Sequence, residues 1–320
     1  MQLQIPRYTL YTSMFILYAF SISFILLPLY DNGDQQFYIA YYNALNNMSF
    51  FEGYFAQRDY LGSQEPGYFL TLFILQKIPF ISKIFIVAAL NTILAYLIAK
   101  WLTKFKVSIF IWMLIALNFY LIVLFFSSER LKLALIFFLL SFSIKKYRLV
   151  FILISLFTHL QIVFLLFSEI FLNFFKGLNM LIFNQKLTRE MLLFIGSLFI
   201  FFIIFIILHQ HILQKLPYYL SQPNKVMDIL KILILILIVL YYNQDKKTEI
   251  VIIFLPLFIS VIILGGNRLI IFGYFIFMYY LLQINQGKNV GLITVSLFFA
   301  FKGIVAIYNI VQYHDIFYIL

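Results

Sequence analysis

Hydrophobic residues form long runs along almost the whole chain, and short polar connections separate them. Runs long enough, or nearly long enough, to cross a bilayer as helices lie at residues 8–29, 82–99, 107–126, 130–144, 149–173, 191–208, 228–242, 250–264, 268–284 and 290–311. A further apolar stretch at 66–80 is shorter than a span requires. The pattern predicts one all-α polytopic membrane domain over residues 1–320, with about 10–11 transmembrane helices if short or re-entrant segments are included.

Composition supports the membrane class and removes soluble alternatives. Hydrophobic residues make up 64% of the chain, charged residues 11%, and the mean hydropathy is +1.00. A net charge of +11 would suggest nucleic acid as a partner of a soluble protein, but here the basic residues lie between apolar runs, where they orient helices. We therefore expect no nucleic-acid partner. The chain has no cysteine, which excludes disulfides and thiol chemistry.

The charge of the connections predicts which side of the membrane each one faces. The stretch 31–65 carries five acidic residues and one basic residue, and a second polar loop lies at about 209–227. Lys and Arg instead cluster at 100–106, 145–148, 176–189 and 246–247. By the positive-inside rule these clusters are cytoplasmic, and both polar loops are expected outside.

Counting the crossings between these loops identifies two irregular segments. An odd number of crossings must separate loop 31–65 from the first basic cluster, yet two apolar segments, 66–80 and 82–99, lie between them. Segment 149–173 likewise joins two basic clusters. We therefore expect 66–80 to be a short helix that does not span, and 149–173 to be broken near Thr158–His159. Such backbone is tolerated only where it is buried in protein or lines a wet cavity.

Each irregular segment carries an ionisable residue, and ionisable residues near lipid are usually functional. Glu65 precedes Pro66 at the start of the short segment, and His159 lies at the expected break. The other candidates, all expected on the outer side, are Asp31, Asp34, Arg130 and Arg268. The structural alternatives are a turn cap for Asp31, a helix start for Glu65–Pro66, a mutual ion pair for Glu129 and Arg130, a carbonyl-bound buried histidine for His159, and a tight turn for Gly265–Asn267.

The combination of residue types favours a shared site over these separate roles. The planar fork of arginine suits phosphate oxygens, and a nearby carboxylate can accept the proton of a hydroxyl nucleophile. We therefore predict group transfer from a lipid pyrophosphate donor that Arg130 and Arg268 bind. Glu65 and Asp34 are the two candidates for the general base, with His159 in support. No metal or cofactor is expected, since two arginines can neutralise a pyrophosphate leaving group.

Several short motifs follow one another over residues 1–285. They are Asp34 with Tyr38 and Tyr41 after the first helix, Glu65-Pro66-Gly67-Tyr68, Ser128-x-Arg130-x-x-x-Ala134, His159 in an apolar run, and Gly266-x-Arg268. This series resembles the EpsG family of exopolysaccharide proteins, which is similar to the Wzy polymerases of capsule and O-antigen synthesis. The family often has glycine at the position of Lys132, so this chain departs from the pattern there.

The resemblance implies a glycosyltransferase of the C-type membrane fold in a bacterial cytoplasmic membrane. Its substrates would be undecaprenyl-pyrophosphate-linked oligosaccharides, joined on the outer face into O-antigen, capsule or exopolysaccharide, and its partners would include a flippase and a chain-length regulator. The implied site has Glu65, Asp34 and His159 as catalytic residues, and Arg130, Arg268, Asp31, Tyr38, Tyr68 and Asn267 as substrate-binding residues. A flippase of lipid-linked oligosaccharides, another lipid-donor glycosyltransferase or ligase, and a structural subunit stay open as alternatives.

Overall fold

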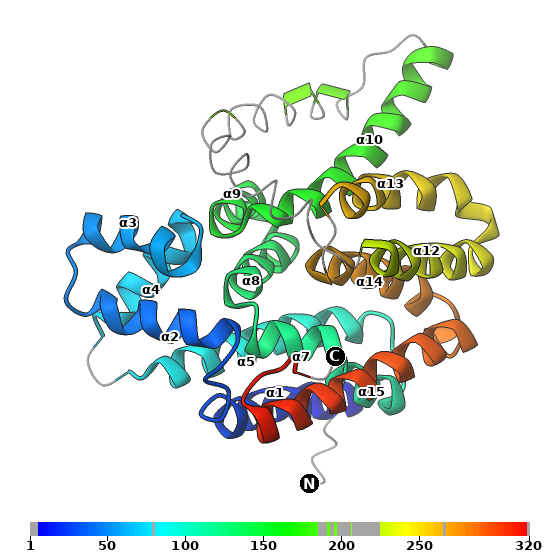
Figure 1. Ribbon diagram of the computed structural model, residues 1–320. Coiled ribbons are helices and arrows are strands. Elements are labelled where there is room, and N and C mark those ends of the chain that lie inside the picture. The colour runs from blue at the N-terminus through cyan, green and yellow to red at the C-terminus, as the bar shows by residue number, and fades with distance from the viewer. Residues whose placement is uncertain are drawn as a thin grey trace, which may run out of the picture. The chain divides into compact units, whose positions relative to one another are not determined.

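The computed structural model describes residues 6–78, 81–184, 191–192, 195–196, 206, 225–264 and 267–318. Within these residues every regular element is helical, which confirms the predicted all-α class (Figure 1). The chain divides into two compact units, one formed by Met1–Ile162 with Leu282–Leu320 and the other by Val163–Leu281. The predicted span 191–208 and the loop 209–227 lie almost entirely outside the described residues.

Among the described residues, three helical segments are each long and apolar enough to cross a membrane. They are α1 (Arg7–Leu26), α5 (Lys83–Thr103) and the segment Asn285–Tyr313, which contains α15 (Val290–Tyr313). A bent pair of helices, Val226–Tyr242 and Gln244–Ile263, also passes the test as a unit, with a bend of 112°. A second bent pair, described in the next paragraph, passes the same test. The described residues therefore contain three helices that could cross a membrane, or up to five if each bent pair is one span, as in an all-α membrane protein.

The apolar run 107–126 is predicted as one helix but folds as two. It forms α6 (Ile109–Ala116) and α7 (Phe119–Phe126), which meet at a bend of 48°. The side chain of Asn118 accepts a hydrogen bond of 2.9 Å from the Tyr120 N–H and so caps α7. Helix α15 packs against this break, and a Cβ at Gly303 would collide with the carbonyl oxygen of Leu117.

The acidic stretch 31–65 is largely helical, which its polar composition does not suggest. It contains α2 (Asp34–Leu45) and α3 (Phe50–Leu61). Helix α3 begins with a capping box, in which the Ser49 N–H donates to the Glu52 carboxylate at 2.9 Å. It ends at Gly62, whose φ of 63° is the left-handed conformation that favours glycine.

Both segments that the topology marks as irregular are irregular in the structure. Helix α4 (Pro66–Gln76) has 11 residues, so it is about 16 Å long, roughly half of the hydrocarbon thickness. Helix α9 (Arg148–Thr158) ends at the expected break, and His159 is extended, with φ −159° and ψ 116°. A single 3₁₀ turn, η2 (Leu160–Ile162), follows. The predictions of a short helix and of a break near Thr158–His159 are confirmed.

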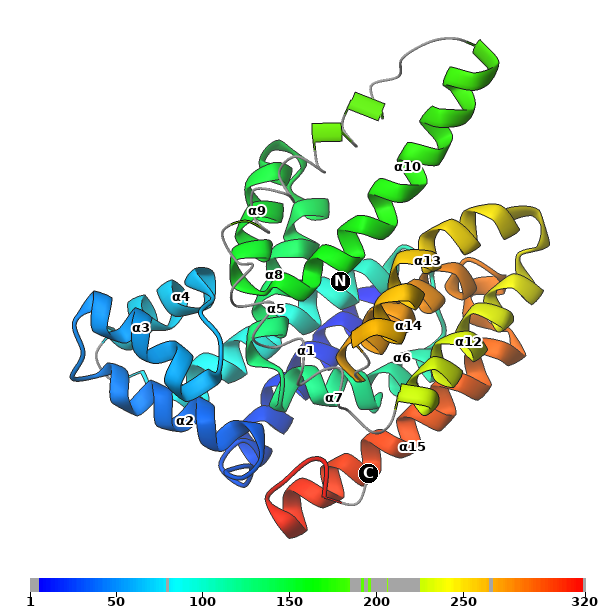
Figure 2. The same cartoon turned by 45° about the horizontal axis from the view of Figure 1, so that its top comes forward.

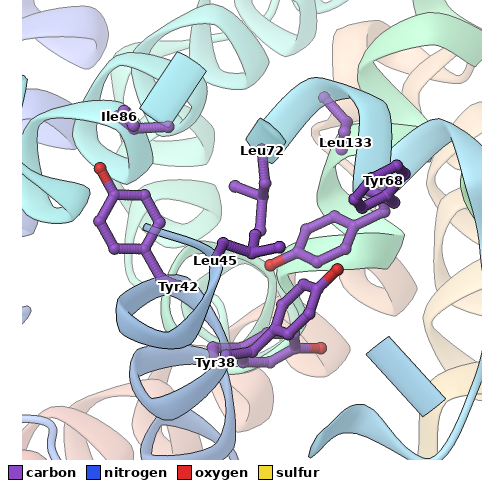
Figure 3. Close-up of a cluster of buried hydrophobic side chains, with 9 residues drawn as sticks. Tyr38, Tyr42, Leu45, Tyr68, Leu72, Ile86 and Leu133 are labelled. Atoms are coloured by element: carbon purple, nitrogen blue, oxygen red, sulfur yellow. The ribbon is translucent and has the colours of Figure 1, made fainter. Parts of the chain in front are cut away.

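Within the first unit, the helices that hold the candidate residues pack closely together. Helix α5 lies between α1 and α8 (Glu129–Ser143), and α9 runs beside α8 (Figures 1 and 2). Helices α2, α3 and α4 form a neighbouring group, and α4 also contacts α9. A buried, tyrosine-rich cluster joins α2, α4, α5 and α8; its members are Tyr38, Tyr41, Tyr42, Leu45, Tyr68, Phe69, Leu72, Ile86 and Leu133 (Figure 3).

The described part of the second unit contains helices α10 (Val163–Asn184), α12 (Lys225–Tyr242), α13 (Lys247–Leu264) and α14 (Asn267–Leu282). Helix α13 packs against both α10 and α12. The predicted apolar runs at 228–242, 250–264 and 268–284 coincide with α12, α13 and α14, respectively. Two predicted site residues, Asn267 and Arg268, belong to this unit and lie at the start of α14.

Candidate active site

Glu65 is the N-cap residue of α4, but its carboxylate does not cap the helix. Pro66 occupies the first helical position, where a missing N–H loses no hydrogen bond. Gln57 of α3 instead holds the backbone of Glu65, because its Oε1 accepts from the Glu65 N–H at 2.9 Å. Glu65 and Pro66 therefore begin α4 as the structural alternative expects, while the Glu65 side chain is directed to other partners.

The first partner of Glu65 is Arg130, in the first turn of α8. Nη1 of Arg130 lies 3.0 Å from Oε2 of Glu65, and Nε donates to the hydroxyl of Tyr38 at 3.3 Å. The two charged side chains are only 9% and 12% exposed, so water screens their attraction weakly. The alternative pairing of Arg130 with its neighbour Glu129 is not what the structure shows.

The second partner of Glu65 is His159, at the break between α9 and η2. Nδ1 of His159 lies 2.6 Å from Oε1 of Glu65, and Nε2 lies 3.1 Å from Oε1 of Gln161. The histidine ring thus contacts two side chains, and not a backbone carbonyl as the structural alternative expected. One carboxylate oxygen binds Arg130 and the other binds His159, so the three residues form a cluster that we call the Glu65 triad.

The surroundings of Glu65 determine its charge. Burial alone would raise the pKa of its carboxyl group, but the cation of Arg130 and then His159 outweigh this effect and hold the pKa well below the ordinary range. Glu65 is therefore ionised at neutral pH. A carboxylate with a depressed pKa is also a weaker base, so Arg130 restrains the proton-accepting capacity of Glu65 while it holds the side chain in place.

Gly67 allows Glu65 to reach His159. A Cβ at this position would lie 2.5 Å from Oγ1 and 2.9 Å from the backbone nitrogen of Thr158, at the end of α9. The absence of a side chain therefore lets the first turn of α4 contact the residue that precedes the histidine. The glycine of the Glu-Pro-Gly-Tyr motif thus has a packing role that supports the triad.

We expect Gly67→Ala to destabilise the folded protein by about 1–3 kcal/mol, because the added methyl group overpacks this contact. Unfolding of the purified protein in detergent measures the effect. Ile74→Ala is a matched control on the same helix, since Ile74 is 61% exposed and its truncation leaves the contact with α9 unchanged. Equal stability of Gly67→Ala and the wild-type protein would contradict the close contact.

A second group of polar side chains surrounds Glu129, which is 3% exposed. Its Oε1 accepts from Gln35 Nε2 at 2.8 Å and lies 3.1 Å from Nζ of Lys83, and its Oε2 accepts from the hydroxyl of Tyr68 at 2.8 Å. Sequence reasoning missed Lys83 and Gln35. The only signal for Lys83 is a single cation at the start of an apolar helix, outside the basic clusters.

The Glu65 triad and the Glu129 group share helices α4 and α8. Glu65 begins α4 and Tyr68 lies in its first turn, while Glu129 and Arg130 are adjacent at the start of α8. Helix α2 also contacts both groups, through Tyr38 to Arg130 and through Gln35 to Glu129. The rings of Tyr38 and Tyr68 meet edge to face, with their centroids 5.9 Å apart (Figure 3). The contacts of Glu129 therefore help to fix the spacing between α4 and α8 on which the triad depends.

Lys132 occupies the position where the resemblance expects a glycine. It is completely buried, and its ammonium group donates to Asn91 Oδ1 at 2.6 Å and to the carbonyl of Phe125 at 3.0 Å. Asn91 in turn donates to the hydroxyl of Ser23 on α1 at 2.8 Å. In this chain, the departure from the family pattern is thus a lysine that links α8 to α5 and α7.

The other predicted site residues have different surroundings. Asp34 begins α2 and accepts a hydrogen bond of 2.7 Å from the hydroxyl of Ser127, and Asp31 is exposed, with its carboxylate 3.4 Å from Nδ1 of His314. Arg268 is half-buried in the first turn of α14, which begins at Asn267 in the second unit. The structure therefore brings together Tyr38, Glu65, Arg130 and His159, and it places Tyr68 in the Glu129 group.

The Glu65 triad combines a proton acceptor with a cation suited to phosphate and an imidazole, each within hydrogen-bonding distance of the Glu65 carboxylate. No protein-family model, curated protein or solved structure matches the chain. The functional assignment therefore rests on the residues and their geometry.

Proposed function

We propose that this protein is a glycosyltransferase that polymerises oligosaccharide repeat units carried on undecaprenyl pyrophosphate, at the outer face of a bacterial cytoplasmic membrane. The Glu65 triad is the single observation that carries the proposal. It lies where a short apolar helix that does not span begins beside a broken one, and it contains the groups that transfer from a pyrophosphate donor to a hydroxyl requires.

In the proposed reaction, the hydroxyl oxygen of the acceptor sugar attacks the anomeric carbon of the donor glycan. The bond from that carbon to the pyrophosphate oxygen breaks, and its electron pair leaves with the lipid pyrophosphate. Arg130 binds the pyrophosphate and stabilises the charge that develops on it. Glu65 accepts the proton of the attacking hydroxyl, and His159 orients the carboxylate. Arg268 and Asp34 remain the sequence-based candidates for a second pyrophosphate ligand and an alternative base.

The glycan profile of a deletion strain tests this function. Without a polymerase, the surface carries single repeat units, and the full-length gene restores the ladder of longer chains on a gel. A flippase predicts a different result, because loss of the protein that moves lipid-linked units across the membrane removes the surface sugar altogether. A normal ladder in the deletion strain would contradict both assignments.

Arg130→Lys should reduce chain extension about tenfold or more, because loss of a charge-assisted contact costs roughly 1.5–3 kcal/mol. Lysine keeps the charge but cannot contact Glu65 and Tyr38 with a planar fork. The initial rate of polymer formation measures the effect, with Arg58→Lys on the exposed side of α3 as the control. Full extension by Arg130→Lys at normal expression would remove Arg130 from the donor site.

A further inference from the structure

The observed contacts of Arg130 conflict with a simple role in donor binding. Its Nη1 is bound to Glu65, its Nε is bound to Tyr38, and its side chain is 9% exposed. An anionic pyrophosphate that binds this guanidinium must therefore come close to the Glu65 carboxylate, which already neutralises the charge of Arg130. Two anionic groups that share one cation in a buried site repel each other, so binding without rearrangement is unfavourable.

We propose that the donor pyrophosphate and the Glu65 carboxylate compete for Arg130, so that donor binding releases Glu65 from Arg130 while Glu65 keeps its contact with His159. This inference rests on the proposed function and deepens it by giving the order of events. The donor takes over the cation first, and only then does Glu65 become available to the acceptor hydroxyl.

The geometry of the triad allows this exchange with little movement. Glu65 binds Arg130 through Oε2 and His159 through Oε1, so one contact can break while the other persists. Gln57 holds the backbone of Glu65, and the contact between Gly67 and Thr158 fixes the turn that follows. The contacts of Glu129 with Tyr68 and Lys83 likewise fix the first turn of α8, which carries Arg130. Only the two side chains have to separate.

The exchange also makes the chemistry depend on the donor. Arg130 is the largest of the effects that depress the pKa of Glu65, so its loss to the pyrophosphate raises that pKa and strengthens the base. The proton of the acceptor hydroxyl then passes to Glu65 as its oxygen bonds to the anomeric carbon, and the pyrophosphate leaves with the electron pair of the broken bond. In the absence of donor, Glu65 stays in the ion pair and is a weak base.

Glu65→Gln tests the competition directly, because it removes the competing charge and keeps the size of the side chain. We expect the purified full-length variant to bind a farnesyl-pyrophosphate-linked N-acetylglucosamine about tenfold more tightly than the wild-type protein, although its turnover is slower. Glu65→Asp provides a second variant that retains the competing charge, so its affinity for the probe should rise less than that of Glu65→Gln.

Two controls separate competition from a general change in charge. Glu52→Gln removes an exposed carboxylate from α3 and keeps its capping box, so its affinity for the probe should equal that of the wild-type protein. In an Arg130→Met background, Glu65→Gln should not increase the affinity for the probe, because the guanidinium for which the two anions compete is absent.

Affinity in Glu65→Gln no higher than in the wild-type protein would overturn the competition, and so would an equal gain in Glu65→Asp, which keeps the competing charge. A gain that persists with Arg130→Met would also overturn it, since the gain would then not depend on Arg130. These results are distinct from failure of the proposed function. A wild-type protein that binds the probe but forms no polymer from lipid-linked repeat units would contradict the polymerase, while tighter binding by Glu65→Gln would still support the competition.

Discussion

Glu65→Gln should slow glycan chain extension by roughly 10²- to 10⁴-fold, the usual contribution of a positioned general base. A sugar hydroxyl is a poor nucleophile until its proton is removed, and the amide of glutamine accepts a proton far more weakly than a carboxylate does. Because the Glu65 carboxylate makes no capping hydrogen bond, the substitution leaves the cap of α4 unchanged. The expected phenotype therefore comes from the chemistry and from the contact with Arg130, not from a lost helix end.

The initial rate of polymer formation by membranes that contain equal amounts of each protein measures this effect. Glu52→Gln makes the same chemical change at an exposed site and should extend chains at the wild-type rate. If Glu65→Gln also builds long polymer at that rate, Glu65 is not the base, and Asp34 is the next carboxylate to test. Asp34→Asn should then show the loss.

Lys83→Met should destabilise the folded protein by about 3–5 kcal/mol, because it leaves the carboxylate of Glu129 buried without the cation at 3.1 Å. Glu129 is 3% exposed, so water cannot replace the lost partner. Adding Glu129→Gln to Lys83→Met should recover much of the loss, since the double variant no longer buries an unpaired charge. Tyr68 can still donate to the single side-chain oxygen of the glutamine, and the glutamine amide can donate to the Gln35 oxygen that Lys83 no longer occupies.

Unfolding of the purified variants in detergent tests this prediction. Lys77→Met removes a lysine that is exposed just after α4 and should change the stability by less than about 0.5 kcal/mol. A Lys83→Met protein as stable as the wild type, or a double variant no more stable than Lys83→Met, would show that the ion pair does not support the start of α8.

The sequence predicts the irregular features of this fold because they leave local signals. Glu65–Pro66 is a recognisable helix start, and the short apolar stretch after it cannot span. The crossing count also locates the break beside His159. A single Asn118 within the apolar run 107–126 gives a much weaker signal, so the division into α6 and α7 was not predicted.

The partners of the charged residues are harder to predict than their identities. Glu129 pairs with Lys83, and Arg130 with Glu65, although Glu129 and Arg130 are adjacent in the sequence. These choices depend on how α2, α4, α5 and α8 pack, and apolar runs that look alike do not specify that packing. The sequence therefore predicts the members of the Glu65 triad, but not the Glu129 group beside it.

Reconstitution of the purified wild-type protein in liposomes with lipid-linked repeat units distinguishes glycan polymerisation from lipid transport in one measurement. We expect a ladder of lengthening glycans and release of one undecaprenyl pyrophosphate for each new linkage. Both products should form roughly 10²- to 10⁴-fold more slowly with the Glu65→Gln protein and at least about tenfold more slowly with the Arg130→Lys protein. Movement of intact lipid-linked units across the bilayer, with no linkage formed and no lipid pyrophosphate released, would contradict the proposed polymerase.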